Sequence, residues 1–279
     1  MRLDIIILNT SKAKRVVQNV QLLLEQKTNF SFQIVVVDNS ENPEQIEILM
    51  TSLMRRPSIR LLLCPKSFGY PHGNNWGAQQ GSAEYIAIIN PDIFCHKPTT
   101  LQKCIDYLDM HKNVGVVGPK QKNEDGSRPI TIRKFPNLFL QMARRSFLRN
   151  LPRIRKYVEA DEMRHINPEK IQEVDWIQSS FLIIRRSLWK EIGGFYEQYF
   201  LFMSDAELCL ETWKHGKKVI YFPEAEVTAD GKRCSEGGFL TLFQKWTLRQ
   251  HVRDALRYWW IHRKEDPSLF RISLGEKGE

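Results

Sequence analysis

The chain has 279 residues, of which 42% are apolar, so it can bury the core of one large domain or of one domain with an appendage. A disordered chain is therefore not the default, and no stretch approaches the roughly 20 uninterrupted apolar residues of a membrane-spanning helix. A formal charge of +9 at pH 7 indicates an anionic partner, and nucleic acid, a membrane surface or a phosphorylated substrate would each satisfy it.

Apolar, strand-like runs recur through the first third of the chain, with helix-compatible stretches between most of them. This alternation predicts parallel strands joined by crossover helices, which is an α/β fold. The predicted strands cover residues 3–8, 33–38, 59–63 and 85–90.

The rest of the chain is less regular, but no Gly-, Ser- or Pro-rich linker and no repeat interrupts it. We therefore expect one domain over residues 1–228, with a nucleotide-binding half over 1–97 and an acceptor half over 98–228. The acceptor half contains a basic segment over 133–156. A helical C-terminal extension is expected over 229–279.

The start of the chain, "MRLDIIILNTSK", carries an acid and polar breaks where a signal peptide needs a clean apolar run. We therefore expect a cytoplasmic protein.

The cysteines are odd in number, scattered and free of any C-x-x-C pair, so they are expected to be reduced and mostly structural. They are Cys64, Cys95, Cys104, Cys209 and Cys234.

Polar side chains follow three of the predicted strands, at the edge where open parallel sheets bind ligands. They are Asn9 after the first strand, Asp38 and Asn39 after the second, and Asn90 and Asp92 after the fourth. The chain has neither a G-x-x-x-x-G-K-[ST] loop nor a G-x-G-x-x-G after the first strand, so the usual kinase and dinucleotide-binding readings lose support.

Asn90-Pro91-Asp92 allows two interpretations. Asn, Pro and Asp are good turn formers, so the tripeptide could simply end a strand. Alternatively, Asp92 presents a carboxylate to a divalent cation bound to a diphosphate, the usual way in which proteins hold Mg²⁺.

Two further stretches bear on this choice. "SFGYPHGNNWGAQ", residues 67–79, has three glycines and two asparagines before a predicted helix, which suits close backbone approach to a ligand, although an ordinary loop would look the same. "FMSDAELCL" contains Asp205, and the run from Ser204 to Glu207 also fits an S-x-x-E capping box.

The order of these motifs resembles family 2 glycosyltransferases of the GT-A fold, and within them the bacterial rhamnosyltransferases that build O-antigen and related surface polysaccharides. The resemblance runs from Leu3 to about Trp259. It implies a Rossmann-like mixed sheet flanked by helices. The segments that carry it are "IIILN", "IVVVDNS", "FGYPHGNN", "INPD", "IRKFP", "VDWIQSSFLIIRR", "GGFYEQYFLFMSDAELCLETWKHG" and "YFPEAEV".

The resemblance also implies roles. Asp38 matches the acid that contacts the base of the donor, and Asp92 matches the last position of the metal-binding D-x-D motif, with Mg²⁺ or Mn²⁺ as the expected ion. Asp205 is the expected general base of an inverting transfer. The predicted donor site comprises Asn9, Asp38, Asn39, Gly69, Asn74, Asn90, Asp92, Arg133 and Arg233, and the predicted acceptor site comprises Trp176, Ser179 and Ser180.

Three positions depart from the family pattern. Ser204 stands where Glu is usual, and the pair Ser179-Ser180 stands where Gly-Ala or Gly-Ser is common. Ala229 stands where many relatives carry a His near the metal and the diphosphate, and Asp230 or Arg233 could take its place.

The basic segment combines six arginines between Arg133 and Arg155 with large apolar residues and no acid, which is the composition of a helix on an anionic membrane surface. Nucleic acid would also accept this segment, but no recognisable binding module accompanies it, so no nucleic-acid partner is expected. The tail "RYWWIHRK" could offer Trp and Arg to a membrane interface or could bury its Trp pair.

The resemblance implies an enzyme that moves a deoxysugar, most readily L-rhamnose from dTDP-L-rhamnose, to a lipid-linked saccharide, and the basic segment places it at the inner face of the cell membrane. A transferase with another donor, such as a UDP-hexose, is the alternative in the same class. From a different class, the altered motifs would suit a non-catalytic partner of a polysaccharide assembly complex that binds sugar nucleotides or membranes.

Overall fold

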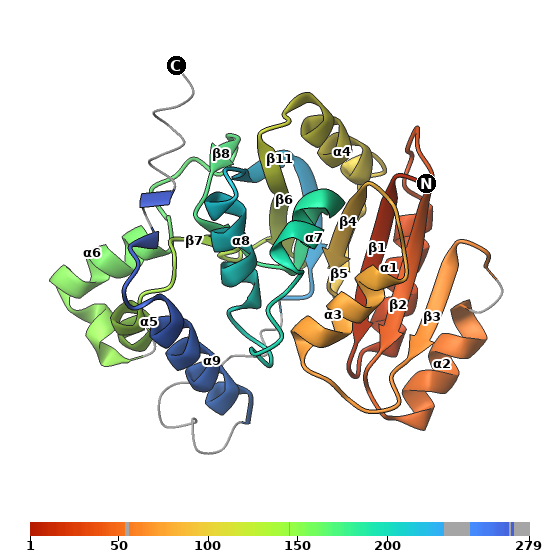
Figure 1. The fold of residues 1–279 in the computed structure, drawn as a ribbon, viewed down its shortest axis with the longest axis horizontal. Coiled ribbons are helices and arrows are strands. Elements are labelled where there is room, and N and C mark those ends of the chain that lie inside the picture. The colour runs from red at the N-terminus through yellow and green to blue at the C-terminus, as the bar shows by residue number, and fades with distance from the viewer. Residues whose placement is uncertain (54–55, 145, 232–245, 268, 271–279) are drawn as a thin grey trace.

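The computed structural model describes residues 1–279 except 54–55, 145, 232–245, 268 and 271–279 (Figure 1). The strands in the described part are β1 (Leu3–Asn9), β2 (Phe32–Asp38), β3 (Ile59–Leu63), β4 (Tyr85–Ile89), β5 (Ile93–Phe94), β6 (Val114–Asn123), β7 (Ile132–Arg133), β8 (Gln172–Glu173), β9 (Trp176–Ile177), β10 (Phe181–Arg185) and β11 (Lys218–Ala229). The helices are α1 (Ala13–Leu24), α2 (Pro43–Leu53), α3 (Tyr70–Gln79), α4 (Thr100–Met110), α5 (Leu138–Arg144), the 3₁₀ turn η1 (Phe147–Asn150), α6 (Pro152–Asp161), α7 (Arg186–Ile192), α8 (Ser204–Lys214) and α9 (Trp246–His262).

A single large sheet, in the order β3-β2-β1-β4-β10-β6-β11-β5, runs through the described part of the chain, and β8 pairs with β11. Strands β3, β2, β1 and β4 are parallel. β10 is antiparallel to both of its neighbours, β4 and β6, so the sheet is mixed. The α/β fold with helices on both faces is therefore confirmed, and the four predicted strands match β1 to β4 within one residue at either end.

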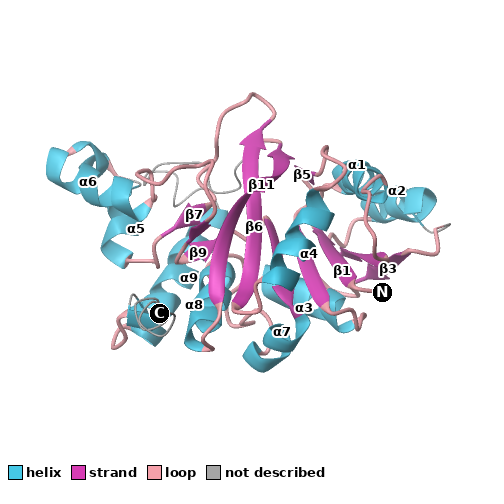
Figure 2. Cartoon of the chain, turned by 90° about the horizontal axis from the view of Figure 1, so that it is seen from above, coloured by secondary structure: helices cyan, strands magenta, loops and turns pink. Residues whose placement is uncertain are grey.

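Side chains alternate between the two faces of the sheet because successive residues of a strand point to opposite sides. In β1, Ile5 and Ile7 pack with α1, α2 and α4, whereas Ile6 and Leu8 pack on the face that carries α3, α7 and α8. Figure 2 shows these helices on the two sides of the sheet. Strands buried on both faces consist of continuous apolar runs, and for this reason they could be predicted from the sequence.

The helices α5, α6 and α9 form a separate cluster next to α8, at the opposite end of the molecule from β3 and α2 (Figure 1). α5 packs against both α6 and α9. A small two-stranded sheet of β7 and β9 connects this cluster to the core. The predicted boundary between 228 and 229 falls at the end of β11 and stays a prediction.

None of the helices in the described ranges combines the length and the apolar character that crossing a bilayer requires. Four cysteines, Cys64, Cys95, Cys104 and Cys209, are free thiols, and three of them are buried. Cys234 lies outside the described residues.

Candidate active site

A cavity of about 720 Å³ opens between the carboxyl end of β4, the small β7–β9 sheet and the helices α5 and α8. Among the predicted site residues, seven line it: Asn90, Asp92, Arg133, Trp176, Ser179, Ser180 and Asp205. The cavity therefore brings the predicted metal ligand, the predicted base and the predicted acceptor residues to one place. Arg233 lies outside the described residues.

Asp205 is the second residue of α8, and its carboxylate is held by backbone donors. The amide N–H of Ser179 donates to Oδ2 at 3.3 Å, and the N–H of Ala206 donates to Oδ1 at 2.9 Å. Burial raises the pKa of Asp205 to about 6, although these hydrogen bonds oppose the shift. A fixed carboxylate with a raised pKa is suited to accept a proton near neutral pH.

The capping box that the sequence allowed around Ser204 does not form. The residue before α8 is Met203, whose backbone is left-handed with φ of 68°, and it makes no side-chain cap. The side chain of Glu207, which a capping box would turn back to the helix start, instead accepts hydrogen bonds from Tyr199 Oη and His262 Nε2, each at 2.8 Å.

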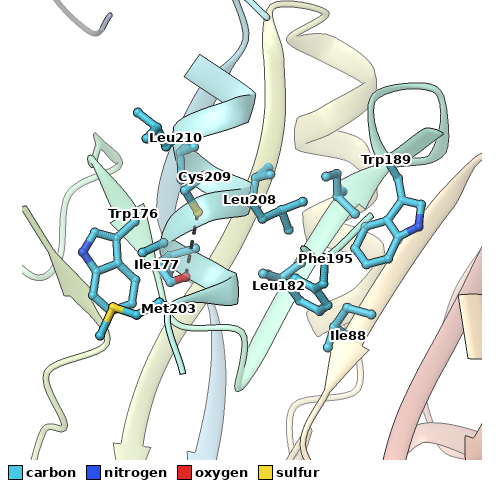
Figure 3. Close-up of a cluster of buried hydrophobic side chains, with 14 of the residues drawn as sticks. Ile88, Trp176, Ile177, Leu182, Trp189, Phe195, Met203, Leu208, Cys209 and Leu210 are labelled. Carbon is cyan, nitrogen blue, oxygen red and sulfur yellow. Dashed lines mark hydrogen bonds between the residues drawn. The ribbon is translucent and has the colours of Figure 1, made fainter. Parts of the chain in front are cut away.

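The apolar side of α8 fixes this helix in the core. Figure 3 shows Leu208 and Cys209 of α8 beside Ile177 and Leu182 of the neighbouring strands, and the Cys209 thiol lies 3.9 Å from the Ile177 carbonyl oxygen. Because interiors are closely packed, Asp205 at the helix start has little freedom to move.

Tyr70 connects the loop before α3 to the cavity. Its hydroxyl lies 3.0 Å from Ser179 Oγ and 3.2 Å from Asn90 Oδ1. Burial raises the pKa of Tyr70, so the hydroxyl remains protonated and can donate. Ser179 thereby contacts Tyr70 through its side chain and Asp205 through its backbone N–H.

A cation from the chain itself lies beside Asp92. The Lys12 ammonium is 2.6 Å from Asp92 Oδ2 and 3.7 Å from Asp230 Oδ2. Both acids line the cavity, so two carboxylates converge on one positive charge. This pair matches the one or two carboxylates with which proteins hold Mg²⁺ next to substrate phosphates.

Asp92 and Asp230 could hold a divalent ion only if a bound ligand supplied further oxygen atoms to it. In the described part of the chain, no group of three or more His, Cys, Asp or Glu side chains could hold a metal ion. Oxygens of a bound diphosphate would have to complete the coordination of an ion at Asp92 and Asp230, and Lys12 would have to move aside.

The predicted residues at the ends of β1 and β2 lie outside the lining of the cavity but are linked to it. Asn9 and Asp38 are partners across the parallel ladder, and Asn9 Nδ2 donates to Asp38 Oδ1 at 2.6 Å. Asn9 Oδ1 in turn accepts the N–H of Lys12 at 2.7 Å. A hydrogen-bonded path thus runs from Asp38 to the lysine that contacts Asp92.

Three predicted donor residues make structural contacts instead of facing the cavity. Both ends of the Asn39 amide bond the backbone of Phe68, at 2.6 and 2.8 Å. A Cβ on Gly69 would lie only 2.6 Å from the carbonyl oxygen of Phe200, so glycine permits this close contact. Asn74 Nδ2 donates to Tyr70 O within α3 at 2.9 Å. Their predicted roles in donor binding stay predictions.

The far wall of the cavity carries several cations from the basic segment. Arg144 lies 3.3 Å from Asp161, and Arg149 lies 3.5 Å from Glu162. Arg133 is 3.9 Å from the same Glu162. Part of the basic segment therefore faces the cavity, while Arg153, Arg155 and Lys156 on α6 are exposed.

The two remaining residues of the predicted acceptor site, Trp176 and Ser180, are fixed by hydrogen bonds. Trp176 Nε1 donates to Lys134 O at 2.7 Å, and Ser180 Oγ accepts from Gln121 Nε2 at 2.8 Å.

Lys12 and Tyr70 were missed by the reading of the sequence. Tyr70 lies inside the quoted glycine-rich loop, and Lys12 follows the first strand by three residues, but only the fold shows that Tyr70 lines the cavity and that Lys12 contacts two acids that line it.

Comparison with known proteins identifies relatives. The sequence profile of Glycosyl transferase family 2 matches residues 4–190. An N-acetylglucosaminyl-diphospho-decaprenol L-rhamnosyltransferase of Mycobacterium tuberculosis is 28% identical over 187 residues, which are 63% of this chain and 60% of that protein. Rhamnosyltransferase WbbL of Escherichia coli K12 is 23% identical over 235 residues, which are 81% of each protein.

Solved structures agree on the fold. A mannosyltransferase from Pyrobaculum calidifontis, in complex with GDP-Man and Mn²⁺, matches with a TM-score of 0.57 at 12% identity, over 99% of this chain and 79% of that one. The likeness shows the GT-A fold.

Proposed function

Because the chain belongs to Glycosyl transferase family 2, we propose that it is an inverting transferase that moves L-rhamnose from dTDP-L-rhamnose to a lipid-linked saccharide. The observation that carries this proposal is one cavity that holds both a carboxylate with a raised pKa, Asp205, and a converging acidic pair, Asp92 and Asp230. The choice of rhamnose is supported by the mycobacterial and Escherichia coli relatives, both of which are rhamnosyltransferases.

In the proposed reaction Asp205 takes the proton from an acceptor hydroxyl. The acceptor oxygen forms a bond to the anomeric carbon, the bond from that carbon to the diphosphate oxygen breaks, and dTDP leaves with the bonding electrons. The backbone N–H groups of Ser179 and Ala206 orient the carboxylate toward the cavity. One displacement at the anomeric carbon inverts its configuration.

The residues around Asp92 would receive the diphosphate. Asp92 and Asp230 would hold Mg²⁺ or Mn²⁺ with the phosphate oxygens, and a bound ion would neutralise the charge of the leaving group. Lys12 is close enough to both acids to contact the same phosphates once they are bound. Asp38 and Asn9, at the far end of the hydrogen-bonded path, would contact the nucleoside.

The acceptor is proposed to enter past Trp176 and the arginines of the far wall. The mycobacterial relative acts on a diphospho-decaprenol, and a diphosphate on the acceptor would suit Arg144 and Arg149. An acceptor with a lipid tail would bring the protein to an anionic membrane surface, as in the assembly of O-antigen or another surface polysaccharide.

A donor panel tests this proposal. The purified chain is incubated with dTDP-L-rhamnose, UDP-glucose, UDP-GlcNAc or GDP-mannose and a short-chain polyprenyl-diphospho-GlcNAc, with Mn²⁺ or with chelator. We expect product from dTDP-L-rhamnose with Mn²⁺ only, and a raised melting temperature with dTDP because a ligand that binds the native state stabilises it. Product from a UDP-hexose alone would replace the donor, whereas binding without turnover of any donor would favour a non-catalytic role.

A further inference from the structure

Helix α9 has two faces with opposite chemistry. Its inner face packs against the rest of the protein, and its members are buried: Leu248, His251, Asp254, Ala255, Tyr258 and His262. Its outer face is exposed and consists of Arg249, Val252, Arg253, Leu256, Trp259 and Trp260, and the exposed Arg263, directly after the last residue of the helix, continues it. At 100° of rotation per residue, these seven residues form one continuous stripe along the helix.

The distribution of polar and apolar side chains on α9 differs from that of an ordinary surface helix. Polar groups such as Asp254 lie inside, whereas the outer face exposes large apolar side chains. Trp260 is 61% exposed, Leu256 48% and Trp259 46%. The Trp pair of the tail is therefore not buried, so one of the two interpretations of that segment is wrong, and contact with a membrane interface stays a prediction. A contiguous exposed apolar stripe marks a surface that contacts a partner.

The charge of the outer face limits the kind of partner. Arg249, Arg253 and Arg263 interleave with the apolar residues, and the only acid within α9 is the buried Asp254. The Arg263 guanidinium lies over the Trp260 ring at 3.7 Å from its centre. A second copy of this face would bring arginine against arginine, so self-association through it is disfavoured.

Trp, Leu and Arg on one helical stripe match a helix that lies in the interface of an anionic bilayer. We propose that the outer face of α9 docks the protein on an anionic lipid surface. Neighbouring α5, which packs on α9, also exposes Phe139 and Met142.

The inner face of the same helix holds the loop that leads to Asp205. The Asp254 carboxylate accepts the backbone N–H groups of Phe200, Leu201 and Phe202 at 3.2, 3.0 and 2.9 Å. Leu201 and Phe202 line the cavity, and so does His251, whose ring contacts Phe202.

One helix therefore contacts both the proposed lipid surface and the wall of the cavity. The lipid contact stands independently, whereas its purpose, presenting a lipid-linked acceptor to Asp205, rests on the proposed function.

Vesicle flotation tests the lipid contact without any nucleotide sugar. The full chain is mixed at low salt with vesicles of phosphatidylcholine alone or of phosphatidylcholine with phosphatidylglycerol. We expect binding only to the vesicles with phosphatidylglycerol, and a loss of about tenfold or more in the double variant Leu256→Ser/Trp260→Ser. A matched charge variant on α6, Arg153→Glu/Lys156→Glu, should retain most of the binding, because α6 carries no such stripe of Trp and Leu.

Several results would overturn the proposal. These are no binding of the native chain to either vesicle, equal binding by the α9 variant, or loss of binding only in the α6 variant. A concentration-dependent dimer in light scattering that the α9 variant abolishes, without vesicle binding, would assign the face to self-association.

Transfer assays separate this proposal from the proposed function. On a water-soluble short-chain acceptor the α9 variant should keep the native rate, and on an acceptor in anionic vesicles it should lose rate in parallel with binding. Vesicle binding by a chain that transfers no sugar would leave the docking surface in place and remove the proposed function.

Discussion

The replacement Asp205→Asn separates a catalytic carboxylate from a structural one. Asn has nearly the same shape, but its side chain offers one acceptor oxygen where Asp offers two. The two backbone donors of Ser179 and Ala206 therefore compete for one oxygen, and one of these hydrogen bonds is lost. A lost hydrogen bond of this kind costs about 1 kcal/mol.

The removal of the charge acts in the opposite direction. Burial raises the pKa of Asp205 from 3.8 to about 6, a difference of about two units, or about 3 kcal/mol. Because the folded-state pKa is raised, the contribution to stability is full below the unfolded pKa and is lost as the pH rises through about 6. Solvent in the cavity reduces this figure, so at neutral pH we expect Asn to stabilise the fold by about 1 kcal/mol net.

The assay measures stability and chemistry on the same sample. Melting temperatures of the native and Asn chains at about pH 8 should differ by a few degrees in favour of Asn, and the difference should vanish or reverse at about pH 4. Single-turnover transfer should fall by about 10²-fold or more, because an amide cannot take the acceptor proton. Binding of dTDP should be unchanged.

Two outcomes would refute the reasoning. A near-native transfer rate would remove Asp205 from the role of base. A lower melting temperature for Asn at about pH 8 would show that the raised pKa does not describe this carboxylate. In the native chain, the rate of the chemical step should also rise with pH through about 6.

Three further substitutions, at two positions, address the acidic pair and the inner face of α9. Lys12→Met removes the cation beside Asp92 and Asp230, so Mn²⁺ measured by electron paramagnetic resonance without nucleotide should bind about fivefold more tightly, and unchanged affinity would argue against a metal at this pair. Asp254→Ala leaves three backbone N–H groups without their acceptor and should destabilise the fold by about 2 to 4 kcal/mol, with Asp254→Asn costing less. Thermal unfolding of both variants checks this, and equal stability of the Ala and native chains would contradict it.

The first half of the fold could be predicted because its signals are local. Strands β1 to β4 are short apolar runs, and parallel pairing alone places the residues after them at one edge, where Asn9 meets Asp38. The antiparallel insertion of β10 between β4 and β6 has no local signal, since it depends on pairing between segments far apart in the chain, such as Phe181 with Ile89 and Ile183 with Val117. The resemblance of the motif order implied a mixed sheet but did not place β10 in it.

Side-chain partners were harder to foresee than elements. Lys12 and Asp92 are 80 positions apart in the sequence, and no pattern in either segment predicts that they form an ion pair. Because the basic segment contains no acid, the sequence indicated one exposed surface. In the structure Arg144 and Arg149 instead form ion pairs with Asp161 and Glu162, just beyond the segment, and line the cavity. The amphipathic pattern of α9 was equally hard to predict, because polar and apolar residues occur on both of its faces: Asp254 and Leu248 are buried, whereas Arg253 and Leu256 are exposed.

The position of Asp205 depends on residues from both ends of the chain. The loop before α8 is held on one side by the loop before α3, where Tyr70 N–H donates to Phe200 O at 2.7 Å and Gly69 leaves room for that contact. On the other side the Asp254 carboxylate holds the same stretch of backbone. Met203 then turns through a left-handed conformation into α8, and such strain persists only where the surroundings impose it. The proposed base is thus held by the start of α3 and by α9 together, so we expect a substitution at Gly69 or Asp254 to lower the transfer rate without removing a contact to substrate.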